Sequence, residues 1–331
     1  MSQPAISAHH LRKIYQVRQK SSGLRGLLRP KYSEVHAVNG IDFTIQPGEF
    51  VGFIGPNGAG KSTTIKMLTG ILSRSGGTVK VGGKDPETHR QQLAYQIGTV
   101  FGQRSQLWYH LPPGDTFEVL ARIYELDRAQ YQQRLKKLVD AFELQEFLHI
   151  PIRKLSLGQR MRCEIAASLL HGPQLIFLDE PTIGLDVIAK QKIREVLREL
   201  NQDDGITILL TSHDAGDIEE LCKRTIVINH GSMIFDDTTA QFKRKFITKK
   251  TVELLTAVPL GNLHPPLGTI VEQADRKLVI EVATDGKDSG GLQKLLAWAT
   301  KELQIADMTV TDPPMEEIIA SIYRAQEVPH E

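Results

Sequence analysis

A glycine-rich segment at residues 55–63 constrains the fold of this chain more than any other feature of the sequence. It follows the apolar run FVGFI, which is typical of a buried strand, and it leads into STTIKMLTG, which has the pattern of a helix. Glycines in such a turn let the backbone wrap tightly, so that several N–H groups and the helix N-terminus converge on one anionic group. The segment therefore predicts a phosphate-binding loop, formed by Gly55, Pro56, Asn57, Gly58, Ala59, Gly60, Lys61, Ser62 and Thr63.

Two side chains at the end of this loop carry the expected chemistry. Lys61 would place a positive charge near the β- and γ-phosphates of a nucleotide and stabilise charge during phosphoryl transfer, and the hydroxyl of Ser62 is placed to bind Mg²⁺. The pattern is typical of P-loop NTPases, a class that includes motors, kinases and GTPases. A chance glycine-rich turn is the alternative, but the strand before the loop and the helix after it favour the phosphate site.

A second apolar run, QLIFLDE at 174–180, ends in two carboxylates. The carboxyl end of such a strand faces the nucleotide in an open α/β sheet, and neighbouring side chains alternate in direction along it. We therefore expect Asp179 to hold magnesium through its water shell and Glu180 to polarise the attacking water as a base. A solvated strand edge would also end in acids, but the phosphate loop makes that alternative the weaker one.

The pentapeptide LSLGQ at 155–159 stands between the phosphate loop and the acidic strand, at the start of a helical pattern. Ser156 at a helix N-terminus, with the free backbone N–H groups behind it, forms a second anion site. With this segment the sequence resembles the ABC ATPase family, whose signature motif is LSGGQ. Ser156, Gly158 and Gln159 match the motif, and Leu157 stands where the family usually has glycine.

The resemblance implies a fold, a pair of ligands and an assembly. The fold is α/β, a P-loop NTPase core of the ABC type with a helical subdomain. In the family the signature segment closes over the γ-phosphate of ATP held by a partner subunit, which is the role expected of Ser156, Gly158 and Gln159. The resemblance thus implies a head-to-tail dimer with two shared sites for ATP and Mg²⁺, made with a second copy of the chain or with a paralogous ATPase subunit.

Four more positions match the family. Gln103 corresponds to the glutamine that senses magnesium and the attacking water and couples the site to the membrane subunit. Gln106 is an alternative for that position, because the local spacing can be aligned in two ways. Asp186 lies in the loop through which the two subunits communicate, and His213 corresponds to the histidine that contacts the γ-phosphate. Tyr15 lies where the family places an aromatic ring against adenine, although it could also be a packed strand residue.

Changes in composition along the chain predict two domains. Residues 1–247 form the ABC ATPase domain, with a basic insert at about 17–34 and a helical subdomain at about 114–170. Residues 248–331 restart with strand-like runs and predict a small α+β accessory domain, for which we expect a dimer-stabilising or regulatory role. The basic insert could contact anionic lipid headgroups or a permease, or it could be a solvated loop.

The bulk composition argues against several other classes. The 40 basic and 39 acidic residues nearly cancel, so the net charge gives no reason to expect nucleic acid as a partner. No run approaches the roughly 18 to 20 apolar residues that would span a bilayer, and the N-terminus lacks the apolar core of a secretory signal. Cys163 and Cys222 give no disulfide framework. We expect a cytoplasmic protein that reaches the cytoplasmic face of the membrane through a permease.

The similarity extends over residues 34–246, including FGQRSQLW, LSLGQRMR and DEPTIGLD, and this range resembles the ATP-binding subunits of ABC-2-type export systems. It implies an ATP-hydrolysing subunit that couples dimer closure to a separate integral-membrane permease, with contact expected at the aromatic-rich loop around Trp108. The ATPase of an importer or of a lipid-trafficking ABC complex remains an alternative. A soluble ABC protein acting on ribosomes or DNA is disfavoured, because the chain has one cassette and no long heptad pattern.

Overall fold

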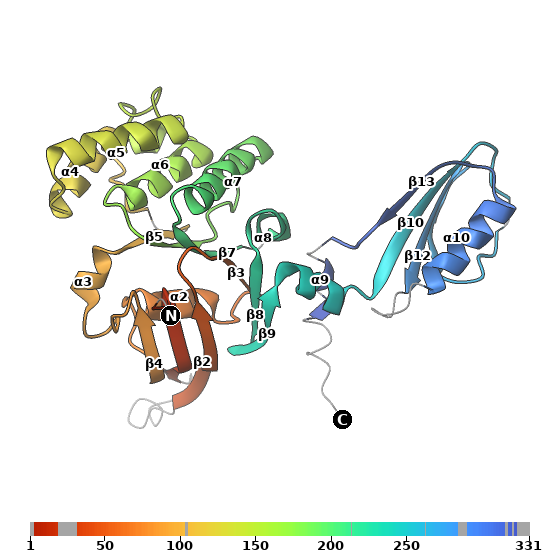
Figure 1. Ribbon diagram of the computed structural model, residues 1–331, viewed down its shortest axis with the longest axis horizontal. Helices are drawn as coiled ribbons and strands as arrows, with labels where there is room; N and C mark the ends of the chain where they lie inside the picture. The colour runs from red at the N-terminus through yellow and green to blue at the C-terminus, as the bar shows by residue number, and fades with distance from the viewer. Residues whose placement is uncertain are drawn as a thin grey trace, which may run out of the picture. The chain divides into compact units, whose positions relative to one another are not determined.

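Figure 1 shows a computed structural model of the chain, which divides into two compact units, residues 1–239 and 240–331. The division falls at the start of helix α9 (Thr239–Phe246), whereas the sequence analysis placed it after residue 247. Residues 19–31 of the predicted basic insert lie outside the described residues, and the residues on either side of them belong to strands. The structure describes residues 3–18, 32–102, 105–212, 214–261, 263–283, 290–314, 317–319 and 321–322.

The larger unit is built around a six-stranded sheet in which five neighbouring strands are parallel and the sixth, β9, is antiparallel. Every residue of β3 and β7 is buried, which is why these strands are nearly continuous apolar runs rather than alternating ones. The sheet confirms the predicted α/β fold. In spatial order the strands are β5 (Ile97–Phe101), β6 (Leu175–Asp179), β7 (Thr207–Thr211), β3 (Phe50–Ile54), β8 (Arg224–Asn229) and β9 (Ser232–Thr238).

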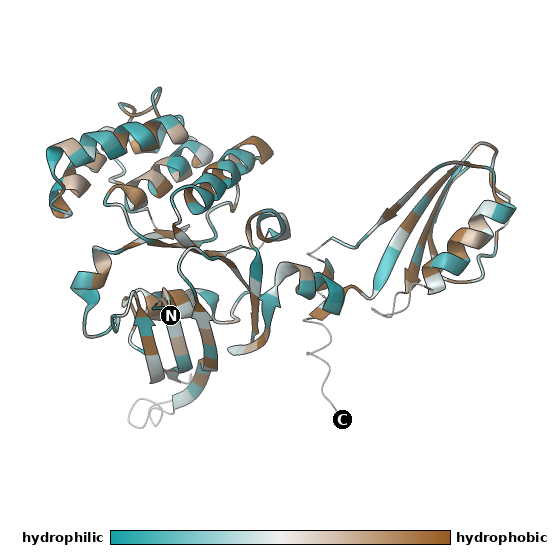
Figure 2. Ribbon diagram, viewed as in Figure 1, coloured by the Kyte–Doolittle hydropathy of each residue, from teal (hydrophilic) through white to brown (hydrophobic). Residues whose placement is uncertain are grey.

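Three more strands form a separate antiparallel sheet, a layer that the sequence analysis did not predict. Figure 2 shows apolar and polar residues alternating along it. Its buried face shares one core with the six-stranded sheet, and the rings of Phe43 and Phe53 meet across that core with centroids 6.0 Å apart. Helix α2 packs into the same core through Ile65 and Leu68, so the helix that follows the phosphate loop is held by both sheets. The elements are β2 (Tyr32–Ile45), β1 (Ile6–Arg18), β4 (Gly76–Val81) and α2 (Lys61–Leu68).

Between β5 and β6 the described residues form helices and no strand. Figure 1 shows α4, α5 and α6 lying together, and α6 packs against α4, α5, α7 and β5. No helix in the described part of the chain is long and apolar enough to cross a membrane. The helices of the larger unit are α3 (Arg90–Ala94), α4 (Pro113–Ile123), α5 (Arg128–Ala141), the 3₁₀ helix η1 (Ile152–Lys154), α6 (Leu157–Leu169), α7 (Val187–Gln202) and α8 (Ala215–Leu221).

The smaller unit contains an antiparallel sheet of four strands with one helix, α10, packed against it. Val252, Leu254 and Ile280 of the sheet are buried with Leu295 and other residues of α10. An α+β unit of this kind is what the sequence predicted. In spatial order the strands are β11 (Thr269–Gln273), β12 (Lys277–Ala283), β10 (Lys249–Thr256) and β13 (Ile305–Thr311), and α10 spans Gly290–Glu302.

Candidate functional site

The glycine-rich segment forms the turn between β3 and α2. Gly60 caps α2 with a left-handed φ of 108°, and a Cβ there would lie 2.4 Å from the carbonyl oxygen of Ala37. A Cβ at Gly55 would lie 2.5 Å from the carbonyl oxygen of Ile228. Larger residues are therefore excluded at both positions, and the loop stays close to the start of α2, where the N–H groups of the first turn are free for an anion.

Lys61 lies inside this turn. Its side chain is 5% exposed, and Nζ donates to the carbonyl oxygens of Gly55 (2.6 Å) and Pro56 (3.3 Å). Burial lowers the pKa of Lys61, while the nearby carboxylates of Glu180 and Asp179 oppose that shift. The amine is thus a partly desolvated cation held against the loop backbone, an arrangement that favours contact with phosphate oxygens.

A cavity of about 480 Å³ brings the loop and the acidic strand together. The predicted loop residues that line it are Pro56, Asn57, Gly58, Gly60, Lys61, Ser62 and Thr63, and they are joined by Asp179 and Glu180. Ala37, Ile71 and Phe101 supply apolar wall. A larger cavity of about 700 Å³ lies at the other end of the parallel strands, where β5, β6 and β7 begin, away from these groups. Of these two cavities, the one of about 480 Å³ lies at the carboxyl ends of the strands, where open α/β sheets bind ligands.

Thr211, at the end of β7, orients both acids and was missed by the sequence analysis. It is paired with Asp179 across the sheet; its hydroxyl donates to Oδ1 of Asp179 (2.6 Å) and accepts from the backbone N–H of Glu180 (3.1 Å). Glu180 has a φ of 57°, a conformation that residues other than glycine rarely adopt. A hydroxyl ending the neighbouring apolar run, ILLTS, was the signal available in the sequence.

The donors around this cavity fit Mg²⁺ bound together with a nucleotide. Carboxylate and hydroxyl oxygens from Asp179 and Ser62 line the cavity, and such ligands suit Mg²⁺. Within the described residues no cluster of three or more His, Cys, Asp or Glu side chains could hold a metal ion alone. This agrees with the usual habit of Mg²⁺, which is held by one or two protein groups together with substrate phosphates.

The signature segment is a well-formed helix start. Ser156 caps α6: its hydroxyl accepts from the N–H of Gln159 (3.2 Å), and the Gln159 side chain accepts in return from the N–H of Ser156 (2.9 Å). A Cβ at Gly158 would lie 2.8 Å from Cβ of Ala189, so the glycine lets α6 approach α7 closely. No residue of 155–159 lines the cavity at Lys61.

The remaining predicted positions are distributed over the larger unit. Asp186 caps α7, accepting from the N–H of Ala189 at 2.8 Å. Tyr15 lies in β1, 37% exposed and with Lys13 Nζ 5.2 Å from its ring centroid, and it does not line the cavity at Lys61. Gln103 and His213 lie outside the described residues.

Gln106, the alternative to Gln103, is engaged with α6 through Glu164. Its side-chain amide donates to the Glu164 carbonyl oxygen (2.8 Å), and its N–H donates to the Glu164 carboxylate (3.1 Å), which also accepts from the hydroxyl of Ser105. Burial raises the pKa of Glu164, and these hydrogen bonds oppose the shift. The start of the aromatic-rich loop is thus fastened to the helix that begins with the signature segment.

Glu164→Ala is expected to lower the free energy of unfolding of the chain by about 1 to 3 kcal/mol, because two partly buried hydrogen bonds to the carboxylate are lost. Glu164→Gln should cost less, since the amide keeps an acceptor oxygen and burial already disfavours the charge. Urea denaturation of both variants and the parent measures the difference. Equal losses for the two variants would show that the charge, rather than the acceptor, holds the loop.

The chain is similar to known proteins over a range that includes this site. Residues 38–183 match the ABC transporter family. The chain is 32% identical over 205 residues to the ABC transporter ATP-binding protein NatA of Bacillus subtilis. This alignment covers 62% of this chain and 83% of NatA. It is 36% identical over 214 residues to a fluoroquinolones export ATP-binding protein of Mycobacterium tuberculosis, covering 65% of this chain and 69% of that protein.

Among solved structures, the chain resembles a dimeric ATP-binding cassette in a post-hydrolysis state bound to ADP and phosphate. The TM-score is 0.60 at 25% identity, over 70% of this chain and 98% of that one. This match spans 98% of the solved cassette, and the family match at residues 38–183 includes both the phosphate loop and the acidic strand. The chain therefore belongs to the family of ABC transporter ATP-binding proteins.

Proposed function

We propose that this chain binds and hydrolyses ATP with Mg²⁺ as one half of an ATPase dimer, and that it drives a separate integral-membrane permease of the export class. The observation that carries the proposal is the meeting of Lys61, Ser62, Asp179 and Glu180 around one cavity at the carboxyl ends of the parallel strands. A phosphate-binding cation, two oxygen ligands for a metal and a base are the groups that phosphoryl transfer to water requires.

Each of these groups has a distinct part in hydrolysis. The N–H groups of the loop and the amine of Lys61 bind the β- and γ-phosphates, while Ser62 and Asp179 hold the metal. Bound magnesium supplies charge neutralisation at the β- and γ-phosphate oxygens. Glu180, held by the N–H contacts to Thr211, polarises the water that attacks the γ-phosphate and takes up its proton.

The nucleotide site is completed by a second copy or a paralogous subunit. Ser156, Gly158 and Gln159 supply the N-terminus of α6 to the γ-phosphate bound by the partner, which fits their absence from the lining of their own cavity. An apolar surface lies beside the signature segment, at the start of α7. Val187 and Ile188 are 82% and 83% exposed there, and the apolar end of α7 is visible in Figure 2. Exposed aliphatic side chains of this kind favour burial in an interface.

We assign roles to four further positions by their resemblance to the family. Gln103 links the metal and the water to the permease, His213 contacts the γ-phosphate, Asp186 signals between the subunits, and Tyr15 stacks on adenine. The exposure of Tyr15 leaves its ring accessible to a ligand.

The permease would bind at the loop between β5 and α4. Trp108 and Tyr109 are 41% and 57% exposed there, and large aromatic side chains are typical anchors of interfaces. The export direction rests on the relative that is named for fluoroquinolone export. Co-purification with a multi-spanning membrane protein, located at the cytoplasmic face, is the expected result; co-purification with ribosomes or DNA would favour a soluble ABC protein instead.

ATP hydrolysis by the purified chain is expected to fall to background when EDTA removes divalent cations, and to recover on addition of excess Mg²⁺. The reason is that the amine of Lys61 and the N–H groups of the loop do not neutralise the phosphate charge alone, and the carboxylate of Asp179 repels the phosphates unless a divalent cation is bound. Release of inorganic phosphate measures the effect. Turnover that continues in EDTA at its original rate would contradict the assignment of Ser62 and Asp179.

A further inference from the structure

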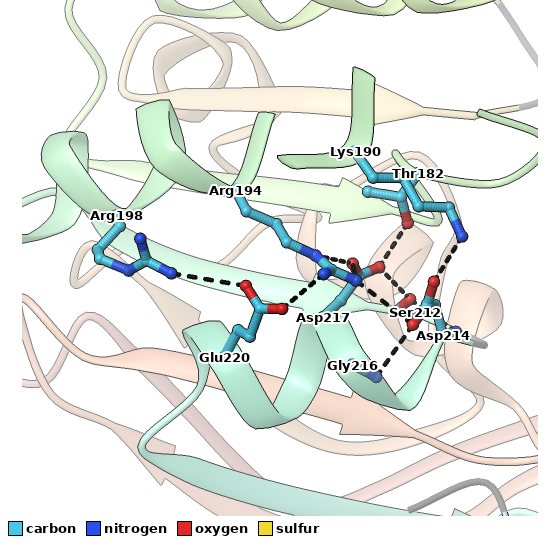
Figure 3. A network of polar contacts seen from close by, with 9 residues as sticks. All are labelled: Thr182, Lys190, Arg194, Arg198, Ser212, Asp214, Gly216, Asp217 and Glu220. Atoms are coloured by element: carbon cyan, nitrogen blue, oxygen red, sulfur yellow. Dashed lines mark hydrogen bonds and ion pairs between the residues drawn. The ribbon is translucent and has the colours of Figure 1, made fainter. Parts of the chain in front are cut away.

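Asp217 is a buried carboxylate that has no part in the mechanism described above. It lies in the first turn of α8 with no exposed surface, and it accepts three side-chain hydrogen bonds. The donors are Thr182 Oγ1 (2.5 Å), Ser212 Oγ (2.6 Å) and Arg194 Nε (2.7 Å). Figure 3 shows these side chains converging on Asp217 from separate elements. A buried carboxylate is stable only when such partners offset its desolvation.

The two hydroxyl donors belong to the segments that leave the nucleotide site. Thr182 follows Glu180 by two residues, and Ser212 directly follows Thr211, whose hydroxyl contacts Asp179. Asp217 is therefore the common acceptor for the chain after β6 and the chain after β7. Any shift of Asp217 would move both segments, and with them the backbone at Glu180 and Thr211.

Arg194, a basic residue of α7, holds the carboxylate of Asp217 in place. Arg194 is 12% exposed and also pairs with Glu220 (2.7 Å) and Asp214 (3.4 Å). Asp214 is held by Lys190 Nζ at 2.5 Å, and its N–H donates to the hydroxyl of Ser212. The carboxylate is thus fixed from α7, the helix capped by Asp186, and neither Asp217 nor Arg194 lines the cavity.

We propose that Asp217, held by Arg194, is a positioning residue for ATP hydrolysis, which fixes the segments after β6 and β7 so that Glu180 keeps its place beside the γ-phosphate. The inference rests on the proposed function. Asp217 touches neither nucleotide nor water in this account, so its loss should slow the chemical step and leave ATP binding intact. A purely structural ion pair would instead affect folding without separating the two kinetic parameters.

Thr182→Val tests this with little disturbance, because valine keeps the shape of threonine and removes one donor while the Arg194–Asp217 pair stays. We expect kcat to fall at least 10-fold, since a misplacement of about 1 Å at a catalytic group can cost 100-fold in rate. The ATP concentration at half-maximal rate should stay at the parent value, while the thermal midpoint falls by a few degrees because the buried carboxylate loses one donor. Thr182→Ser restores the hydroxyl and should restore kcat.

Arg198→Ala is the matched control. Arg198 lies at the outer end of the same network, 38% exposed and 3.7 Å from Glu220, and it does not contact Asp217. Its removal should leave kcat unchanged. A Thr182→Val variant with the parent kcat, or equal losses in Thr182→Val and Arg198→Ala, would overturn the inference.

Asp217→Asn, expected to lower kcat further, provides the second variant. If it fails to fold, Thr182→Val still decides the question. An assay of the parent chain alongside the variants distinguishes failure of the proposed ATPase function from failure of the positioning role of Asp217. A parent without ATPase activity would contradict the proposed function and the inference built on it, whereas an active parent with an unaffected Thr182→Val variant would contradict the positioning role alone.

Discussion

Replacement of Glu180 by glutamine is expected to reduce ATP turnover by at least 100-fold while ATP still binds, because a positioned general base contributes about 10²- to 10⁴-fold. The amide has the size of the carboxylate but cannot take up the proton of the attacking water. The strained backbone at Glu180 and its N–H contacts to Thr211 do not depend on the side-chain charge. The loss should therefore appear in kcat, measured by phosphate release, with the affinity for ATP retained.

The same variant should accumulate as a dimer in ATP and Mg²⁺. Closure depends on binding and opening depends on hydrolysis, so blocking hydrolysis shifts the population to the closed state. Size-exclusion chromatography with and without ATP measures this shift. Glu199→Gln, on the exposed surface of α7, is the matched control and should turn over ATP as the parent does. Normal turnover by Glu180→Gln would mean that another group is the base.

The parts of the fold that could be predicted from the sequence are those in which a short segment determines its own local structure. The apolar runs of β3, β6 and β7 and the glycine-rich segment before α2 predicted an α/β sheet and a turn that leads from a strand into a helix, and both are present. The separate sheet of β2, β1 and β4 was not predicted, because pairing between distant strands leaves no local pattern beyond alternation.

The site was predictable only in part, because some of its residues act through contacts between segments that are distant in sequence. Lys61, Ser62, Asp179 and Glu180 carry recognisable chemistry at fixed spacing, and the structure brings them around one cavity. Thr211 and Asp217 act through contacts with residues that are distant in sequence, at positions set by strand register and helix packing. Gln103 and His213 stay predictions, since both lie outside the described residues.

The second large expected effect is the loss of ATPase activity in two variants, Lys61→Ala and Ser156→Asp, which are then mixed. Lys61→Ala removes the cation of the phosphate loop, and Ser156→Asp keeps a good helix cap but places a negative charge where the partner's γ-phosphate would approach. Each variant alone should lose nearly all ATPase activity, by at least 100-fold, because every site in its homodimer lacks one half. Thermal midpoints equal to that of the parent serve as the control for folding.

The mixture of these two variants tests most directly whether two copies share each ATP site. In a mixed dimer, the Lys61 of one chain faces the intact Ser156 of the other, so one of the two sites is complete. An equimolar mixture that exchanges subunits freely should recover about a quarter of the parent activity if the sites act independently. A mixture as inactive as its two components, or full turnover by Ser156→Asp alone, would contradict the shared site.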